Sequence, residues 1–196
     1  MDVEKTIANL QHRRFQVRRF ATGAEAAAYL AEAVRGKTVG IGGCKTVDQI
    51  GLWDMLEDGK AFWHWKQGAG EEIYAAAASA DVYITGANAI SEDGEILNID
   101  GRGNRLASQL YGHEKVYVVS SVKKICPDFD SALYRARNTA ATENCRRFPA
   151  QTPCKQDGKC HDCRSPQRIC NALVVLWAPM MGMETEIVLI DEPLGM

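Results

Sequence analysis

Apolar residues recur along the chain with two spacings, one typical of buried strands and one typical of amphipathic helices. Short apolar or β-branched runs predict strands at residues 15–20, 38–41, 61–65, 82–84, 115–120, 172–177 and 186–190. Helical spacing predicts helices at about residues 2–14, 24–34, 47–57, 70–80, 105–112 and 130–144. This alternation predicts an α/β fold with a mostly parallel sheet covered by helices on both faces. The last two strands are joined only by residues 178–185, so we expect them to form a C-terminal antiparallel hairpin.

The stretch Asp81–Leu106 departs from this simple alternation. It begins as a strand and continues as a hairpin, with Asp93-Gly94 between two short apolar runs. A glycine turn at Gly101 and Gly103 then leads into a helix. A polar loop of this kind, held by a rigid sheet, is typical of a recognition site.

Ligands of parallel α/β sheets bind at the carboxyl ends of the strands, and three loops there carry suitable residues: 40–46, 85–105 and 120–127. The first loop reads Gly-Ile-Gly-Gly-Cys-Lys-Thr between a strand and a helix, where backbone amides can bind an anion. The alternative is a plain tight turn. The predicted cofactor- or ligand-binding residues of the first two loops are Gly42, Gly43, Thr46, Gly86, Asn88, Gly101 and Gly103.

Three polar residues around the second glycine turn are the candidates for catalysis. Arg105 is suited to clamping a carboxylate or phosphate, and Asp100 is suited to serving as a general base or to holding a hydroxyl. Asn104 lies between them in the sequence. The alternative is that these side chains only satisfy the backbone of the turn.

Length and charge narrow the class of protein. A chain of 196 residues is predicted to form a single domain, residues 1–196. Its net charge of −2 gives no electrostatic basis for binding nucleic acid. No apolar run reaches the roughly 20 residues that cross a bilayer, and the N-terminus lacks the apolar core of a signal peptide. We therefore expect a cytoplasmic protein without membrane or nucleic-acid partners, and leave a homo-oligomer open.

Five of the seven cysteines fall in an irregular, cysteine-rich insertion at about residues 145–171. Cys154, Cys160, Cys163 and Cys170 have the spacing C-x5-C-x2-C-x6-C, and the C-x2-C pair is a recurrent metal clamp. The four could hold zinc or an iron–sulfur cluster, and the spacing does not separate the two. The alternative is a loop with free thiols.

Together these motifs resemble the lactate utilisation (LUD) domain family in its small stand-alone form. The resemblance rests on TVGIGG-x-K-T, on DVYITGANAISEDGEILNIDGRGNR, on the cysteine segment and on the final EPLG, and it covers about residues 5–196. It implies a Rossmann-like α/β fold, similar to the isomerase, CoA-transferase and formyltetrahydrofolate cyclo-ligase group. It also implies a part in oxidising lactate to pyruvate together with separate iron–sulfur subunits. One departure is Cys44, where the family pattern favours serine.

Three functions follow as hypotheses. The first is an oxidoreductase component that binds a small anionic 2-hydroxy acid in a cleft between the glycine-rich loops. The second is a transferase or ligase-like enzyme that acts on CoA, a nucleotide or a folate. The third is a non-catalytic, ligand-sensing module with a structural zinc site.

Overall fold

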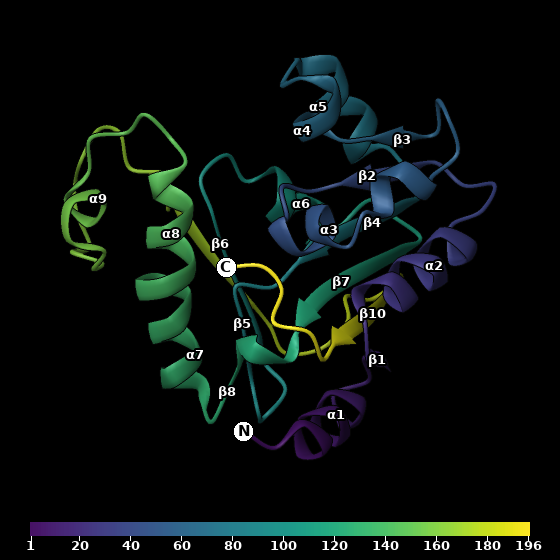
Figure 1. The fold of residues 1–196 in the computed structure, drawn as a ribbon, viewed down its shortest axis with the longest axis horizontal. Helices are drawn as coiled ribbons and strands as arrows, with labels where there is room; N and C mark the ends of the chain where they lie inside the picture. Colours follow the sequence, from purple (N-terminus) through teal and green to yellow (C-terminus); the bar gives the residue numbers. More distant parts are fainter.

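The computed structural model describes residues 1–196 and contains two sheets (Figure 1). The large sheet has six parallel strands in the order β1-β10-β7-β4-β2-β3. The small sheet has four strands in the order β8-β5-β6-β9 and mixes parallel and antiparallel pairs. The strands are β1 (Gln16–Phe20), β2 (Val39–Ile41), β3 (Ala61–Phe62), β4 (Val82–Gly86), β5 (Ala89–Ser91), β6 (Ile96–Asp100), β7 (Lys115–Ser121), β8 (Ile125–Cys126), β9 (Ala172–Leu176) and β10 (Glu184–Ile190).

Helices and short helical turns connect these strands. They are α1 (Val3–His12), α2 (Gly23–Ala33), α3 (Lys45–Gln49), η1 (Leu52–Met55), α4 (His64–Gln67), α5 (Glu71–Ala78), α6 (Asn104–Leu110), η2 (Val122–Lys124), α7 (Phe129–Arg135), the π-helical turn η3 (Ala136–Ala140), α8 (Ala141–Arg146) and α9 (Pro153–Asp157). None of them is both long enough and apolar enough to cross a membrane. The Rossmann-like α/β architecture expected from the sequence is confirmed.

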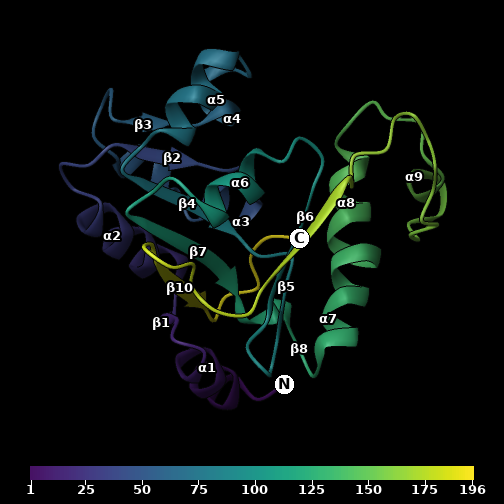
Figure 2. The same ribbon diagram turned by 180° about the vertical axis from the view of Figure 1, so that it is seen from behind.

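Alternate residues of the central strands build two different cores. Val82 and Ile84 of β4 pack with α2, α3 and η1, whereas Tyr83 packs with α1 and α5 on the other face. The second core also takes Ile90 and Ile96 from the small sheet, whose far face is covered by α7. The small sheet therefore lies between the large sheet and the α7–α8 helix, as Figures 1 and 2 show.

The predicted C-terminal hairpin is wrong. β9 pairs antiparallel with β6 in the small sheet, while β10 lies in the large sheet, parallel to both β1 and β7. The side chains of Ile187–Ile190 are buried on both faces of the sheet. This is typical of an inner strand of a parallel sheet, whereas a hairpin commonly has one solvent-exposed face. The short connection between β9 and β10 led to the prediction of a hairpin, but in the structure it carries the chain from the small sheet to the large one.

Two further boundaries differ from the predicted ones. The expected helix at 47–57 divides at Gly51, which adopts a left-handed conformation with φ +70° and separates α3 from η1. The expected strand at 61–65 is only two residues long and turns at Trp63 into α4. By contrast, the long helix at 130–144 is confirmed as a continuous helix over 129–146 that contains the π turn. The hairpin at Asp93-Gly94 is confirmed too, with Gly94 at φ +87°.

Candidate functional site

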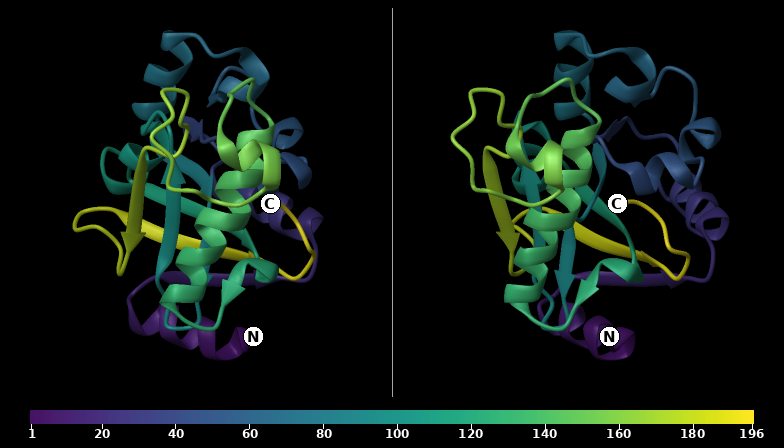
Figure 3. Two further views of the ribbon diagram at one scale, coloured as in Figure 1. Left: turned by 90° about the vertical axis from the view of Figure 1, so that its left-hand side faces the viewer. Right: turned by 60° about the vertical axis from the view of Figure 1, so that its left-hand side comes forward.

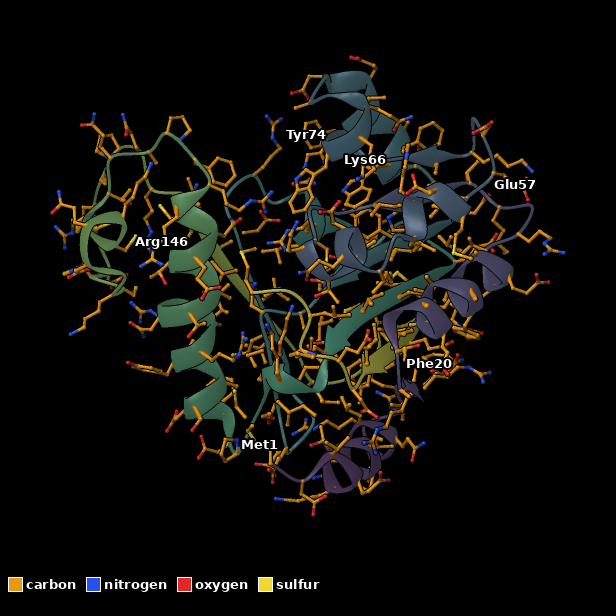
Figure 4. The ribbon with its side chains drawn as sticks, in the orientation of Figure 1. Met1, Phe20, Glu57, Lys66, Tyr74 and Arg146 are labelled. Atoms are coloured by element: carbon orange, nitrogen blue, oxygen red, sulfur yellow. The ribbon has the colours of Figure 1, made fainter.

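A cleft of about 770 Å³ opens at the carboxyl ends of β2 and β4. Its walls come from the first glycine loop, from the end of β6 with α6, from α4 and α5, from α8 and from the end of the cysteine segment, defined here as residues 145–171. Figure 4 labels Tyr74 on the α5 side and Arg146 at the end of α8, on two sides of this region. Segments far apart in the sequence thus surround one space.

Arg105 and Asp100 form an ion pair in the wall of the cleft. The Arg105 Nε lies 3.3 Å from the Asp100 Oδ2, and both side chains are largely buried. The Asp100 carboxylate also accepts from the backbone N–H groups of Gly101 at 2.7 Å and of Arg105 at 3.2 Å. Arg105 Nη2 donates to the carbonyl of Ile99 at 2.6 Å. Because its oxygens are already engaged, Asp100 is better suited to holding Arg105 than to taking a proton.

The glycines of the first loop allow close packing against this arginine. A Cβ atom at Gly42 would lie 2.9 Å from Arg105 Cγ and 2.9 Å from the Tyr83 hydroxyl. A Cβ atom at Gly43 would lie 3.1 Å from the indole nitrogen of Trp65. The absence of side chains at these two positions therefore lets the loop touch both neighbouring walls.

Lys124 is a functional candidate that the sequence argument did not single out, although it lies in the predicted loop 120–127. Its ammonium donates to Thr46 Oγ1 at 3.0 Å and to the carbonyl of Ala87 at 3.2 Å, and no carboxylate lies within 4.0 Å. The pKa of Lys124 is lowered to about 8, mainly by burial; Cys44 acts in the opposite direction, and the nearby cations Arg135, Lys123 and Arg105 add to the lowering. In the sequence, only the position of Lys124 after a predicted strand pointed to the cleft. Its burial results from tertiary packing and cannot be read from the sequence.

The last residues of the chain pack over this amine. A Cβ atom at Gly195 would lie 2.7 Å from Lys124 Nζ and 2.4 Å from Thr46 Oγ1. The Gly195 carbonyl accepts from Lys123 Nζ at 2.9 Å. The glycine of the EPLG motif therefore allows the chain to approach the floor of the cleft.

Aromatic and basic side chains line the opposite wall. The Arg147 guanidinium lies 4.1 Å above the Trp65 ring, and the Arg102 guanidinium lies 4.3 Å from the Tyr74 ring centre. The His64 ring packs against Tyr74 at 4.9 Å. Burial and then the charges of Arg102 and Arg105 lower the pKa of His64, so that its imidazole is neutral at pH 7.

The structure sorts the predicted site residues into two groups. Those that line the cleft are Gly43, Gly86, Asn88, Asp100, Gly101, Asn104, Arg105 and Cys170. Gly42, Thr46 and Gly103 do not line it: Gly42 contacts Arg105, Thr46 contacts Lys124, and Gly103 precedes α6 with φ +91°. Contact of any of these residues with a ligand stays a prediction.

Asn88 and Asn98 tie the end of β4 to β6. The Asn98 amide donates to the carbonyl of Gly86 at 3.0 Å, and the Asn88 side-chain oxygen accepts from the Ile99 N–H at 2.6 Å. Asn98 is buried, so its hydrogen bonds are protected from water. This network holds the strand ends that carry the cleft, which is a positioning role more than a ligand-binding one.

A second cavity, of about 260 Å³, lies beside the cleft and is called the cysteine cavity here. Five thiols line it: Cys145, Cys154, Cys160, Cys163 and Cys170. No three His, Cys, Asp or Glu side chains are arranged to hold one metal ion. Metal binding by the four predicted cysteines stays a prediction. Cys170 lines both cavities, so the cysteine segment reaches the cleft.

Comparisons with known proteins agree with this architecture. The crystal structure of a DUF162 family protein from Deinococcus radiodurans is similar over 96% of this chain and 95% of that chain, with a TM-score of 0.55 and 13% identity. At that identity the likeness supports the fold alone. No curated protein matches the chain. The model of the LUD domain matches residues 3–190, nearly the whole sequence. The resemblance drawn from the motifs is thus confirmed: the chain belongs to the LUD domain family, which is associated with lactate utilisation.

Proposed function

We propose that the cleft binds a small carboxylate of the 2-hydroxy acid class, with lactate as the first candidate, and that the protein is a component of lactate utilisation. The observation that carries this proposal is charge. The only acidic side chain among the lining residues is that of Asp100, whereas the basic side chains are those of Lys45, Arg102, Arg105, Lys124, Arg147 and Arg168. The whole chain has a net charge of −2, so the cleft is a local positive region that favours anions.

Not all of these cations are neutralised within the protein. Lys45, Arg102 and Arg168 pair with carboxylates, whereas no acid lies within 4.0 Å of Lys124 or Arg147. Arg105 engages its Nε and Nη2 atoms internally, which leaves Nη1 for a ligand. A carboxylate between Arg105 and Lys124 would relieve the repulsion that the two cations exert on each other.

The residues of the cleft supply binding, orientation and proton transfer in this proposal. Oxidation of a 2-hydroxy acid to a 2-oxo acid removes two protons and two electrons. His64, neutral at pH 7, is the lining side chain best suited to accept the hydroxyl proton. No side chain stores two electrons, so the acceptor is a bound cofactor or an iron–sulfur partner subunit.

The size and lining of the cleft favour a second candidate, a ligand of nucleotide or CoA size. A volume of about 770 Å³ is far more than lactate fills and lies within the range of sites for large cofactors. The guanidinium groups of Arg102 and Arg147, which lie over the rings of Tyr74 and Trp65, are suited to holding the phosphates of such a ligand. The two candidates are compatible if such a ligand is the electron acceptor.

Calorimetric titration with lactate, pyruvate and the neutral analogue lactamide tests the first candidate. We expect lactate or pyruvate to bind, with an affinity that falls as salt rises, and lactamide to bind at least about tenfold more weakly because the charge contact is lost. Equal binding of lactate and lactamide, or of neither, would contradict the proposal. A parallel titration with CoA and nucleotides tests the second candidate.

Substitutions at two arginines, one in the cleft and one outside it, test whether lactate binding is specific to the cleft. Arg105→Lys keeps the positive charge but loses the planar fork, and should weaken lactate binding about tenfold while leaving the circular dichroism spectrum unchanged. Arg35→Ala removes an exposed arginine just after α2 that does not line the cleft, and should leave binding unchanged. Equal effects of the two substitutions would show that the binding is non-specific.

A further inference from the structure

The cysteine cavity gathers five of the seven cysteines of the chain. The cavity lies between the 129–146 helix, the start of β9 and the loop that joins these two elements. Figure 3 shows this loop curving past the end of α8. The remaining two, Cys44 and Cys126, are buried elsewhere. Such a concentration of thiols around one space is not needed for packing, because this segment contributes little to the core: only Cys145, Ala150 and Thr152 of its residues are buried.

The thiols form no ready grouping around a single ion, and the cavity between them has room for a larger group. Thiolates that bind one zinc ion lie about 2.3 Å from it, and so crowd around a point. Here the thiols surround a void of about 260 Å³, and no three of them are arranged for one ion. In an iron–sulfur cluster each cysteine binds a different iron atom, so the ligands surround a body instead. We propose that Cys154, Cys160, Cys163 and Cys170 bind a [4Fe–4S] cluster in this cavity.

The fifth thiol belongs to the scaffold. Cys145 lies on α8, is 2% exposed, and is bonded to Thr152 Oγ1 at 3.1 Å. The four proposed ligands are half-buried, and three of them lie on irregular backbone. The ligands are therefore the thiols that can adjust to the cluster, while Cys145 fixes the helix beside it.

Two arginines supply the charge that such a cluster needs. Four thiolates and the inorganic sulfides make a negative group, and N–H donors to sulfur stabilise it. Arg137 Nη2 donates to the Cys160 sulfur at 3.6 Å. Arg168 donates to the carbonyls of Cys163 and Cys170, each at 2.9 Å, and so holds two proposed ligands in place.

The rest of the lining suits an oxygen-sensitive group. Ile99, Leu133 and Ile169 give the cavity an apolar side. Ile99, Ile169 and Cys170 also line the cleft, so the cluster would lie directly behind its wall. This inference does not depend on which ligand the cleft binds.

Metal and sulfide analysis of the full chain, purified without oxygen and then reconstituted with ferrous iron and sulfide, tests the proposal. We expect about four iron atoms and four acid-labile sulfides per chain. Visible absorption should bleach with dithionite as a paramagnetic signal appears. One equivalent of zinc in the anaerobically purified chain, without iron after reconstitution, would overturn the proposal.

Substitutions identify the ligands. Cys160→Ser and Cys163→Ser combined should reduce bound iron at least about tenfold. Cys126→Ser is the matched control, because Cys126 is buried outside the cavity, and it should keep the iron. Cys145→Ser should also keep it. Iron retained by the double variant, or lost equally from the Cys126 variant, would overturn the assignment.

Thiol alkylation of the unaltered chain gives a test that does not depend on the folding of variants. With the cluster bound, the four ligands should resist iodoacetamide, and they should react once the cluster is removed. The protection of Cys126 should stay the same in both states. Alkylation of the four cysteines at one rate in both states would overturn the proposal.

Discussion

The cleft and the cysteine cavity share a wall but are held in different ways. The cleft is carried by strand ends: Val82–Ala87 is wholly buried, and Asp100 is held by two backbone N–H groups. The cysteine cavity is closed by residues 146–171, which are mostly exposed and contain one short helix, α9. The core fixes the positions of the cleft residues, whereas contacts among polar side chains and thiols fix the positions of the residues around the cysteine cavity.

This difference separates two ways of building a site. A side chain that must hold a ligand at a fixed distance benefits from lying on rigid strands. The conformational entropy of these residues is already lost when the core folds, so ligand binding need not order them. A segment that binds a metal group can be ordered by that group itself, because the binding free energy adds to the stability of the segment. We therefore expect the cleft to be formed without a ligand, and the cysteine segment to tighten when its cluster binds.

The largest expected effect is on local unfolding of the cysteine segment, detected by proteolysis. In the metal-free chain, trypsin should cut within residues 146–168 at least about tenfold faster than at Arg102 or Arg105, because segments with few buried contacts open at low free energy. Bound cluster should slow the first cut about tenfold. Mass spectrometry of early fragments measures both rates. First cuts in the 82–105 stretch would remove the contrast between the two regions.

The next largest effect compares two aspartates that each pair with arginine. Asp100→Ala should lower the free energy of unfolding by about 3 kcal/mol, because it leaves Arg105 with a buried, uncompensated charge. Asp162→Ala should lower it by less than about 0.5 kcal/mol, because Asp162, which pairs with Arg137 and Arg168, is 69% exposed. Urea unfolding of the two variants measures the difference. Similar losses would mean that the cysteine segment is as well packed as the cleft.

The sequence predicted the part of the site that is local in the chain. Strand, hairpin, glycine turn and helix follow one another within Asp81–Leu106, so pattern alone placed Asp100 and Arg105 together. It could not place Trp65, Arg147 or Lys124, because they meet the cleft through tertiary packing of distant segments. For the same reason the short join before β10 led to a wrong prediction: its length is local, whereas the choice between two sheets depends on the core. Cysteine spacing likewise left a metal site and a loop of free thiols open, because spacing along the chain does not give the positions of the thiols in space.

Lys124 should give a smaller effect, visible in the pH dependence of stability. Its pKa falls from 10.5 when unfolded to about 8 when folded, so the unfolded chain binds more protons between these pH values. Stability should therefore rise with pH across that window, by about 2 to 3 kcal/mol, and the cost of burying the charge should be fully present below pH 8. In Lys124→Met this rise should be absent. Urea midpoints between pH 7 and 10.5 measure it, and parallel curves for the two proteins would contradict the burial of a charged amine.

Loss of the positive charge on Lys124 should also weaken ligand binding, whether pH or substitution removes it. Lactate affinity of the unaltered chain should fall as pH rises through 8, because Lys124 becomes neutral. In Lys124→Met the affinity should be low and independent of pH in this range. Titrations at pH 7 and pH 9 measure the change, and an equal fall in both proteins would assign the pH dependence to another group.

The smallest expected effect comes from one methyl group at the wall of the cleft. Gly42→Ala would bring a Cβ to 2.9 Å from Arg105 Cγ and from the Tyr83 hydroxyl, so Arg105 must shift by a few tenths of an ångström. A shift of that size should weaken lactate binding a few-fold, about 1 kcal/mol, because the guanidinium no longer meets the carboxylate squarely. Gly70→Ala is the matched control, since its near neighbours are the flexible Glu72 carboxylate atoms. Calorimetry should show the loss only at Gly42; if binding is unchanged there, the cleft is as adaptable as the cysteine segment, and its rigid strands do not set the position of Arg105.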